Sequence, residues 1–169
     1  MKKFGLLGEK LSHSKSPDIH QMIFQKLDIN GKYDLVETSP EDIEKYIEKY
    51  DGLNVTIPYK ETVKPLLKSL SKEAKSIGAV NTIYEKKGYN TDYFGFEKML
   101  NVKNIKVDKK ICVILGTGGA SKAVKYYLKK NNAKKIISVS RSKKGKNITN
   151  HDYIQATKAA ISIHTTHLG

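Results

Sequence analysis

The stretch I-C-V-I-L-G-T-G-G-A-S-K-A-V-K at positions 111–125 decides the fold. Its first five residues are apolar and strand-like, a glycine-rich turn follows, and apolar residues after the turn recur with the period of a helix. The run I-I-S-V-S at 136–140 then supplies a second strand. Strands joined through a helix in this order must run parallel. The sequence therefore predicts an α/β protein.

The glycine turn has the context of a dinucleotide site, because it lies between a strand and a helix. Gly116 allows a tight turn, Gly118 lets the backbone approach a pyrophosphate, and a small residue follows where a third glycine is often found. The helix N-terminus offers N–H groups to the phosphates. We expect contacts from Gly116, Thr117, Gly118, Gly119 and Ala120. A turn that merely joins strand to helix is the alternative.

The residues after the next strand indicate which dinucleotide binds. An NAD site usually has an acidic residue there, whereas this chain has S-R-S-K-K at 140–144, including its only arginine. A guanidinium, hydroxyl donors and a second cation suit a 2′-phosphate. We therefore expect NADP, with an exposed loop arginine as the alternative. The predicted contacts are Ser140, Arg141, Ser142 and Lys144.

Apolar and helical patterns also alternate before this segment, and residues 101–110 are polar without a clear period. We predict two domains, one at 1–101, for which the family resemblance described below implies substrate binding, and an NADP-binding, Rossmann-like domain at 102–169. The second domain has fewer strands than a doubly wound sheet, so we expect it to be incomplete. Further helices are predicted from apolar spacing, one with Ile19, Met22, Ile23 and Leu27 inward, one carrying Ile43 and Ile47, and one through Val63, Leu66 and Leu67.

Polar residues follow several predicted strands of the first domain. Ser14 and Ser16 lie before a helix, where two hydroxyls could hold a small carboxylate, although Ser16 could instead be an N-cap. Lys60 comes just after the strand predicted at 52–57, and Asp92 comes after the strand predicted at 79–84. Because open α/β sheets bind ligands at strand ends, Lys60 and Asp92 could meet in one crevice.

Composition narrows the function classes. The formal net charge is +14, but 30 of the 31 basic residues are lysines spread over the chain, which is typical of a solvated surface more than of a nucleic-acid or other polyanion interface. The single Cys112 favours a reducing, cytoplasmic setting. No apolar run is long enough to span a membrane. His164 and His167 have no evident third ligand, so we expect no metal.

Taken together, these stretches resemble the shikimate dehydrogenase family. The family's H-S-x-S-P stands at 13–17, its G-x-N-V-T-x-P-x-K at 52–60, its G-A-V-N-T at 78–82 and its N-T-D-x-x-G at 90–95. Its glycine-rich cofactor turn and arginine-centred phosphate loop correspond to the two segments described above.

The resemblance implies roles for matching residues. Ser14 and Ser16 would hold the substrate carboxylate, while Thr56, Asn81 and Asp92 would bind ring hydroxyls. Lys60 and Asp92 would be the catalytic pair in the NADPH-dependent reduction of 3-dehydroshikimate to shikimate, a step of aromatic amino-acid biosynthesis. A cationic acid can protonate the oxygen that receives charge when hydride arrives, and the neighbouring carboxylate favours the charged lysine.

Two departures from the family pattern keep alternatives open. The family's N-T-T-P-x-G reads H-T-T-H-L-G at 164–169, and family members continue well beyond this length. A quinate/shikimate dehydrogenase relative, a non-catalytic shikimate-binding remnant and a polyanion-binding protein are the alternatives. The oligomeric state is not predicted.

Overall fold

A computed structural model describes residues 1–140, 148–149 and 161–165. The chain divides into two compact units, Met1–Asn90 and Thr91–Gly169. We expected the junction after residue 101. The division falls earlier because the helix Asp92–Val102 packs within the second unit, where Phe96 and Tyr127 rings lie 5.3 Å apart.

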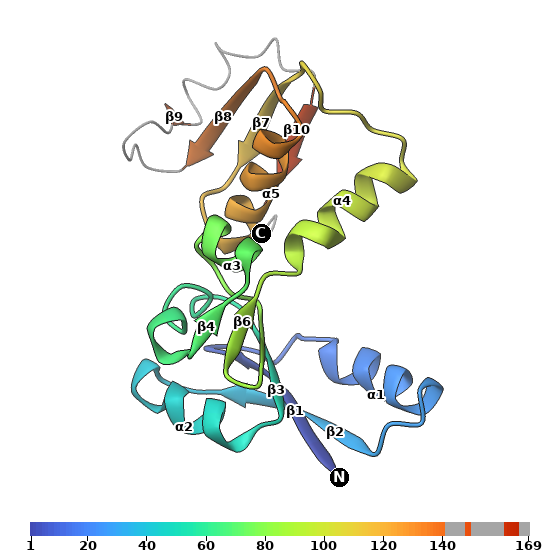
Figure 1. The fold of residues 1–169 in the computed structure, drawn as a ribbon, viewed down its shortest axis with the longest axis vertical. Coiled ribbons are helices and arrows are strands. Elements are labelled where there is room, and N and C mark those ends of the chain that lie inside the picture. Colours follow the sequence, from blue (N-terminus) through green and yellow to red (C-terminus); the bar gives the residue numbers. More distant parts are fainter. Residues whose placement is uncertain (141–147, 150–160, 166–169) are drawn as a thin grey trace. The chain divides into compact units, whose positions relative to one another are not determined.

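The first unit is a six-stranded mixed sheet with helices (Figure 1). Its strand order is β2-β1-β3-β5-β6-β4, in which β2, β1 and β3 are parallel and β5 runs antiparallel to β3. The elements are β1 (Lys2–Gly8), α1 (Ser16–Lys26), β2 (Gly31–Glu37), η1 (Pro40–Asp42), α2 (Ile43–Lys49), β3 (Gly52–Val55), η2 (Lys64–Leu66), β4 (Ser69–Leu70), α3 (Lys72–Ile77), β5 (Thr82–Tyr84) and β6 (Lys87–Tyr89).

The main core of this unit lies on one face of the sheet. Leu7, Leu53 and Val55 alternate along their strands with residues of the opposite face, and Ile43 and Ile47 of α2 pack against them. Ile43 and Ile47 are the inward positions that the sequence pattern of this helix predicts. Burial of these aliphatic side chains contributes roughly 1.5–3 kcal/mol each.

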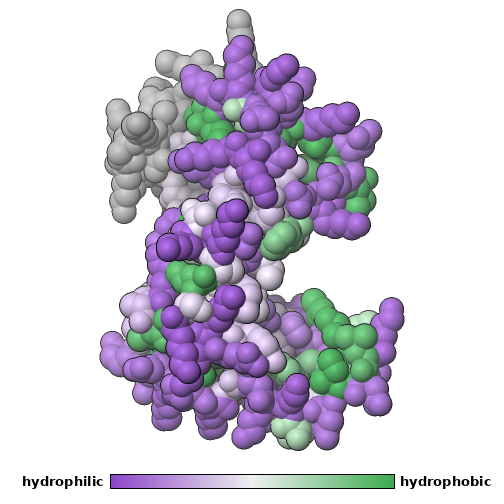
Figure 2. Space-filling view, in the orientation of Figure 1, coloured by the Kyte–Doolittle hydropathy of each residue, from purple (hydrophilic) through white to green (hydrophobic). Residues whose placement is uncertain are grey.

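Helix α1 forms as expected, but it turns a different side to the sheet. Its buried residue is Phe24, whose ring lies 5.4 Å from Phe4 of β1. The four apolar residues that we expected inward, Ile19, Met22, Ile23 and Leu27, are exposed. They contribute to the hydrophobic surface over α1 in Figure 2. The apolar period thus identified the helix but not its packing face.

The helix predicted through Val63, Leu66 and Leu67 is wrong. This stretch contains the short 3-10 turn η2 and then β4, which pairs with β6. Pro65 lacks an N–H donor, which disfavours a continuing α-helix. Val63 is nevertheless fully buried, so the apolar spacing reflects packing on the core.

The second unit contains a parallel four-stranded sheet in the order β10-β7-β8-β9 (Figure 1). Its elements are α4 (Asp92–Val102), β7 (Ile111–Leu115), α5 (Gly119–Lys130), β8 (Lys135–Ser140), β9 (Ile148–Thr149) and β10 (Ile161–His164). The β7-α5-β8 segment is the parallel βαβ unit that the sequence predicts. The α/β fold class is therefore confirmed.

Helix α5 is anchored through its apolar side. The helical period after the glycine turn predicts one apolar face with Ala120, Ala123, Val124, Tyr127 and Leu128. The last four are buried and Ala120 is exposed, whereas Gly119 and Ser121 are buried. No helix in the described part of the chain is long and apolar enough to cross a bilayer.

Candidate functional site

Several predicted substrate residues gather at one edge of the first unit's sheet. Strands β1 and β3 are parallel and end there, and antiparallel β5 begins there. The Thr56 amide donates to the Leu7 carbonyl at 2.9 Å, and the Val55 amide donates to the Asn81 carbonyl at 2.8 Å. These bonds hold Thr56 and Asn81 beside the ends of neighbouring strands.

Gly8 makes the close approach at this edge possible. A Cβ atom at position 8 would lie 2.6 Å from Leu11 Cδ2 and 2.8 Å from Thr56 Cγ2. Leu11 belongs to the loop that leads to Ser14, and its amide donates to Glu37 Oε1 at 2.6 Å. The missing side chain thus lets the serine loop and Thr56 pack together, a role that the sequence motifs did not reveal.

Ser14 and Ser16 form a local hydrogen-bonded pair. The Ser14 hydroxyl donates to Ser16 Oγ at 3.1 Å and accepts from the Ser16 amide at 3.2 Å. Ser16 is the first residue of α1, and Lys15 occupies the N-cap without a side-chain capping bond. The N-cap interpretation of Ser16 is therefore wrong, and both hydroxyls remain within the predicted carboxylate seat.

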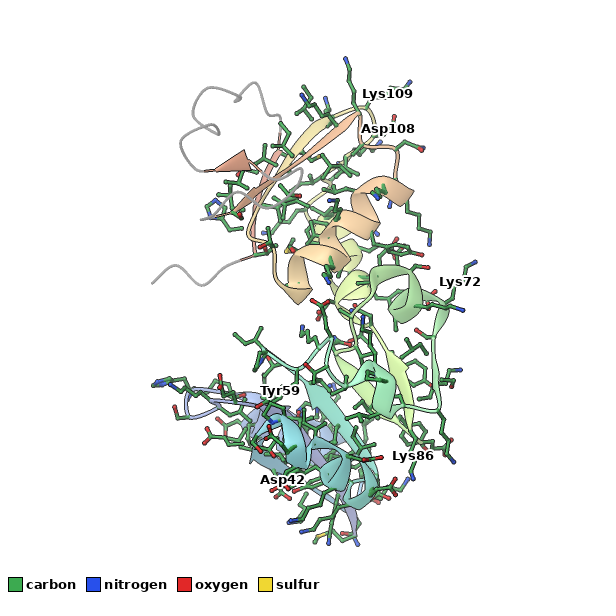
Figure 3. The ribbon with its side chains drawn as sticks, turned by 90° about the vertical axis from the view of Figure 1, so that its left-hand side faces the viewer. Asp42, Tyr59, Lys72, Lys86, Asp108 and Lys109 are labelled. Carbon is green, nitrogen blue, oxygen red and sulfur yellow. The ribbon has the colours of Figure 1, made fainter. Side chains whose placement is uncertain are left out.

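Lys60 has a firmly held backbone. Its carbonyl accepts from the Val80 amide at 2.7 Å, which joins the end of N-V-T-I-P-Y-K to G-A-V-N-T. The preceding Tyr59, labelled in Figure 3, is 2 % exposed and donates its hydroxyl to the Thr38 carbonyl. Lys60 itself is half-buried. The backbone of this lysine is thus fixed next to the segment that carries Asn81.

Three polar residues that sequence reasoning missed connect the predicted substrate residues. Tyr33 donates to Asn54 Oδ1 at 2.7 Å, Asn54 Nδ2 donates to Thr82 Oγ1 at 3.4 Å, and Thr82 donates to Asn81 Oδ1 at 3.1 Å. The available signal was the polar Asn54 inside an otherwise apolar strand.

Asn90 marks the point where the chain leaves the first unit. It is 1 % exposed, and its side-chain Nδ2 donates to the Ala79 carbonyl at 2.9 Å. Asp92 begins α4 and belongs to the second unit. The anchored Asn90 fixes the chain close to Asn81, but the pairing of Lys60 with Asp92 stays a prediction.

The second unit presents the glycine turn as expected, between β7 and α5. Gly116 is buried with φ of +118°, a conformation that L side chains rarely adopt, and its amide donates to Val139 O at 2.9 Å. Gly118 caps α5 with an ordinary φ of −76°, and an added Cβ would meet nothing within 4 Å. The fold therefore requires glycine at 116, while at 118 glycine leaves open space.

The N-terminus of α5 suits an anion. Its first turn contains no acidic residue, and the buried Ser121 hydroxyl donates to the Gly118 carbonyl at 2.6 Å, which steadies the turn. Thr117 and Ala120 are exposed, and Gly119 is buried. The residues present thus fit the phosphates of a dinucleotide.

Ser140 ends β8, directly beside the strand that leads into the glycine turn. This placement agrees with a cofactor role at the shared strand edge. The other predicted 2′-phosphate residues, Arg141, Ser142 and Lys144, lie outside the described residues, as does His167.

Cys112 and His164 are the two remaining residues that the sequence analysis considered. Burial raises the pKa of the Cys112 thiol, which disfavours the reactive thiolate. His164 ends β10 opposite Leu115. Among the described residues, no group of three or more potential ligands could hold a metal ion.

Comparisons of the sequence and of the fold match proteins of one family. A family model described as shikimate dehydrogenase substrate binding domain matches residues 6–83. The shikimate dehydrogenase (NADP(+)) of Clostridium beijerinckii is 46 % identical over 186 residues, an alignment that covers the whole chain and 69 % of that relative.

Solved structures agree. Shikimate dehydrogenase 1 of Peptoclostridium difficile matches with a TM-score of 0.90 and 43 % identity, covering all of this chain and 68 % of that one. Shikimate 5-dehydrogenase of Thermus thermophilus, in complex with NADP(H) and shikimate, matches with a TM-score of 0.84 and 28 % identity, covering 98 % of this chain and 69 % of that one.

Proposed function

Because the chain belongs to the shikimate dehydrogenase family, we propose that it catalyses the reversible NADP-dependent reduction of 3-dehydroshikimate to shikimate. The observation that carries the proposal is the convergence of Thr56, Lys60 and Asn81 at one sheet edge, beside the loop that bears the paired serines. A hydroxylated cyclic carboxylic acid matches this set of donors and acceptors.

Each polar group has a task in this reaction. Ser14 and Ser16 hold the carboxylate, for which the Ser14 hydroxyl turns its proton from Ser16 Oγ to the ligand. Thr56, Asn81 and Asp92 position ring hydroxyls. NADPH, when bound, supplies the hydride that adds to the carbonyl carbon. As the carbonyl electron pair moves to oxygen, the Lys60 ammonium transfers a proton to that oxygen, so one hydride and one proton are consumed.

The cofactor would be held by the second unit. The glycine turn, from Gly116 to Ala120, would receive the pyrophosphate at the α5 N-terminus, with Ser140 at the neighbouring strand end. Arg141, Ser142 and Lys144 would bind the 2′-phosphate. The open space over Gly118 supports this assignment.

Absorbance at 340 nm tests the activity, with NADPH and 3-dehydroshikimate supplied to the chain and to Lys60→Ala. We expect the substitution to lower kcat by about 10²–10⁴-fold, because it removes the proton donor. Lys68→Ala is the matched control, since Lys68 is an exposed lysine of the same unit. The control should retain full activity.

Two results would contradict the enzymatic proposal. Equal loss in both lysine variants would remove the special role of Lys60. An inactive parent chain that still binds shikimate in calorimetry would instead identify a binding protein without catalysis. Each result is separable from misfolding by circular dichroism.

The reverse reaction supplies an independent check. Oxidation of shikimate requires a neutral amine at Lys60 to accept the hydroxyl proton, so its rate should rise as pH increases above neutrality. The rate should be measured where chemistry limits turnover. A flat alkaline profile would argue against Lys60 as the base.

The proposed partners are small molecules and the proposed location is the cytoplasm, in keeping with a single buried cysteine. We propose no role in binding nucleic acid, since the positive charge is almost entirely lysine. Salt-sensitive retention of a random DNA duplex by the purified chain would contradict this view.

A further inference from the structure

A series of hydrogen bonds and one aromatic stack crosses the first unit's sheet from the serine loop to Asn81. It starts with the 3.1 Å bond from Ser14 to Ser16. Tyr33 stacks on His20, whose Nδ1 lies 2.8 Å from the Ser16 carbonyl oxygen. Hydrogen bonds of the Tyr33, Asn54 and Thr82 side chains continue the series to Asn81. Residues predicted to touch the carboxylate are thereby connected to one predicted to touch a ring hydroxyl.

Strand register explains how side chains on different strands meet. Asn54 of β3 and Thr82 of β5 are directly opposite in an antiparallel pair, so their side chains share one face. Tyr33 of β2 is aligned with Phe4 of β1, and Asn54 is aligned with Leu6. Tyr33 therefore reaches over β1, whose Phe4 and Leu6 lie on that same face.

The donors in the series all point the same way. The Tyr33 hydroxyl donates to Asn54 Oδ1, and Asn54 Nδ2 donates to Thr82 Oγ1. The Thr82 hydroxyl donates its only proton to Asn81 Oδ1. This last bond decides which way the Asn81 amide faces, because its oxygen is committed to Thr82. Its NH₂ group then points away from Thr82 as a donor.

Packing fixes the position of the Tyr33 ring, and so fixes the direction of its hydrogen bond to Asn54. Its ring stacks on His20 of α1 at 3.8 Å between centroids and 16° between planes. His20 Nδ1 is in turn 2.8 Å from the Ser16 carbonyl oxygen. Burial raises the pKa of Tyr33, although the Ser16 hydrogen bond opposes the shift, so the phenol keeps its proton at neutral pH.

We propose that Tyr33, Asn54 and Thr82 are positioning residues that set the orientation of Asn81 and the two serines for a shikimate-like ligand. This inference rests on the proposed function, because it takes Ser14, Ser16 and Asn81 as the ligand-binding groups. The three residues act through others and need not touch the ligand. The 3.4 Å link from Asn54 to Thr82 is the longest, so Thr82 has the more direct influence on Asn81.

Calorimetric titration of the full chain with shikimate tests the proposal. Tyr33→Phe keeps the stacked ring but removes the donor, and Thr82→Val keeps the branched shape but removes the hydroxyl. Each should weaken affinity by about threefold to tenfold, the effect of losing one hydrogen bond. Thr82→Ser, which retains the hydroxyl, should bind like the parent.

Tyr50→Phe is the matched control for Tyr33→Phe. The Tyr50 hydroxyl donates to Asp34 Oδ2 at 2.9 Å, so the control also loses one tyrosine hydrogen bond in the same unit, outside the series. Its shikimate affinity should equal that of the parent. Thermal unfolding of every variant separates lost affinity from lost folding. If Tyr33→Phe unfolds, the comparison of Thr82→Val with Thr82→Ser still decides the test.

A double-mutant cycle shows whether Thr82 acts through Asn81. In an Asn81→Ala background, Thr82→Val should weaken affinity by less than about twofold, because its target is already absent. Full additivity of the two losses would overturn the inference, as would parent-like affinity of Thr82→Val. A parent chain that does not bind shikimate would overturn the proposed function itself, and the inference with it.

Discussion

Gly8 is the buried last residue of β1 in the first unit and Gly118 follows β7 in the second, and their surroundings differ. A Cβ on Gly8 would overlap Leu11 and Thr56, whereas a Cβ on Gly118 would meet no atom within 4 Å. The first site is built by close contacts and a hydrogen-bonded series. The second is built by leaving side chains out, which keeps backbone N–H groups accessible to a ligand.

Gly116→Ala should produce the largest effect in this comparison. The φ of +118° is strained for alanine, and the residue is buried, so we expect the free energy of unfolding to fall by about 3 kcal/mol. Urea unfolding followed by circular dichroism measures the change. Stability equal to that of the parent would show that the turn does not need this conformation.

Gly8→Ala should lower the free energy of unfolding by about 2 kcal/mol, as expected for overpacking. Leu11 or Thr56 must shift to accept the new methyl group. Shikimate affinity should therefore fall while NADPH affinity stays unchanged. Weakened NADPH binding would contradict the assignment of separate tasks to the two units.

Tyr50→Phe should cost about 1 kcal/mol of stability, because it removes a partly exposed hydrogen bond to the Asp34 carboxylate. Burial, followed by the bond to Asp34, raises the pKa of Tyr50 from 10.0 to about 12. The bond's contribution is thus complete below pH 10 and is lost as pH rises through 12.

Urea midpoints of the parent and Tyr50→Phe at pH 8 and near pH 12 check this dependence. The difference between the two proteins should shrink at the higher pH. A constant difference would mean that the ionisation of Tyr50 is not linked to folding.

Gly118→Ala should have the smallest effect on stability, within about 0.5 kcal/mol, because alanine fits the backbone conformation and the space is open. NADPH affinity should nevertheless fall, since the methyl group would stand where the backbone approaches the pyrophosphate. Fluorescence titration with NADPH measures it. Unchanged affinity would remove Gly118 from the cofactor site.

Local sequence patterns predicted much of this molecule. The β7-α5-β8 unit follows from an apolar run, a glycine turn and a helical period, and the G-x-N-V-T-x-P-x-K and G-A-V-N-T motifs located Lys60 and Asn81. Two further errors occurred where the hydrophobic period alone was used. Met22 has helical spacing but is exposed, and Val63 has helical spacing but precedes a 3-10 turn.

Packing accounts for both errors. Helix α1 contacts the sheet through Phe24 and His20, aromatic partners of Phe4 and Tyr33, and these contacts between distant segments leave no signal in the spacing. Pro65 prevents a regular helix while Val63 still reaches the core. A period reports that one side of a segment is apolar, but not which neighbour covers it.

The sequence by itself determined the α/β class and the family, and it predicted the residues of both candidate sites, because glycine turns and short polar motifs act locally. Only the tertiary structure showed that Gly8 leaves room for Thr56 to pack. It also showed that Tyr33, which stacks on His20 near Ser16, is linked through Asn54 and Thr82 to Asn81. Those contacts depend on strand order and register, which bring together residues distant in the chain. Side-chain hydrogen bonds require such proximity, so no local pattern could specify them.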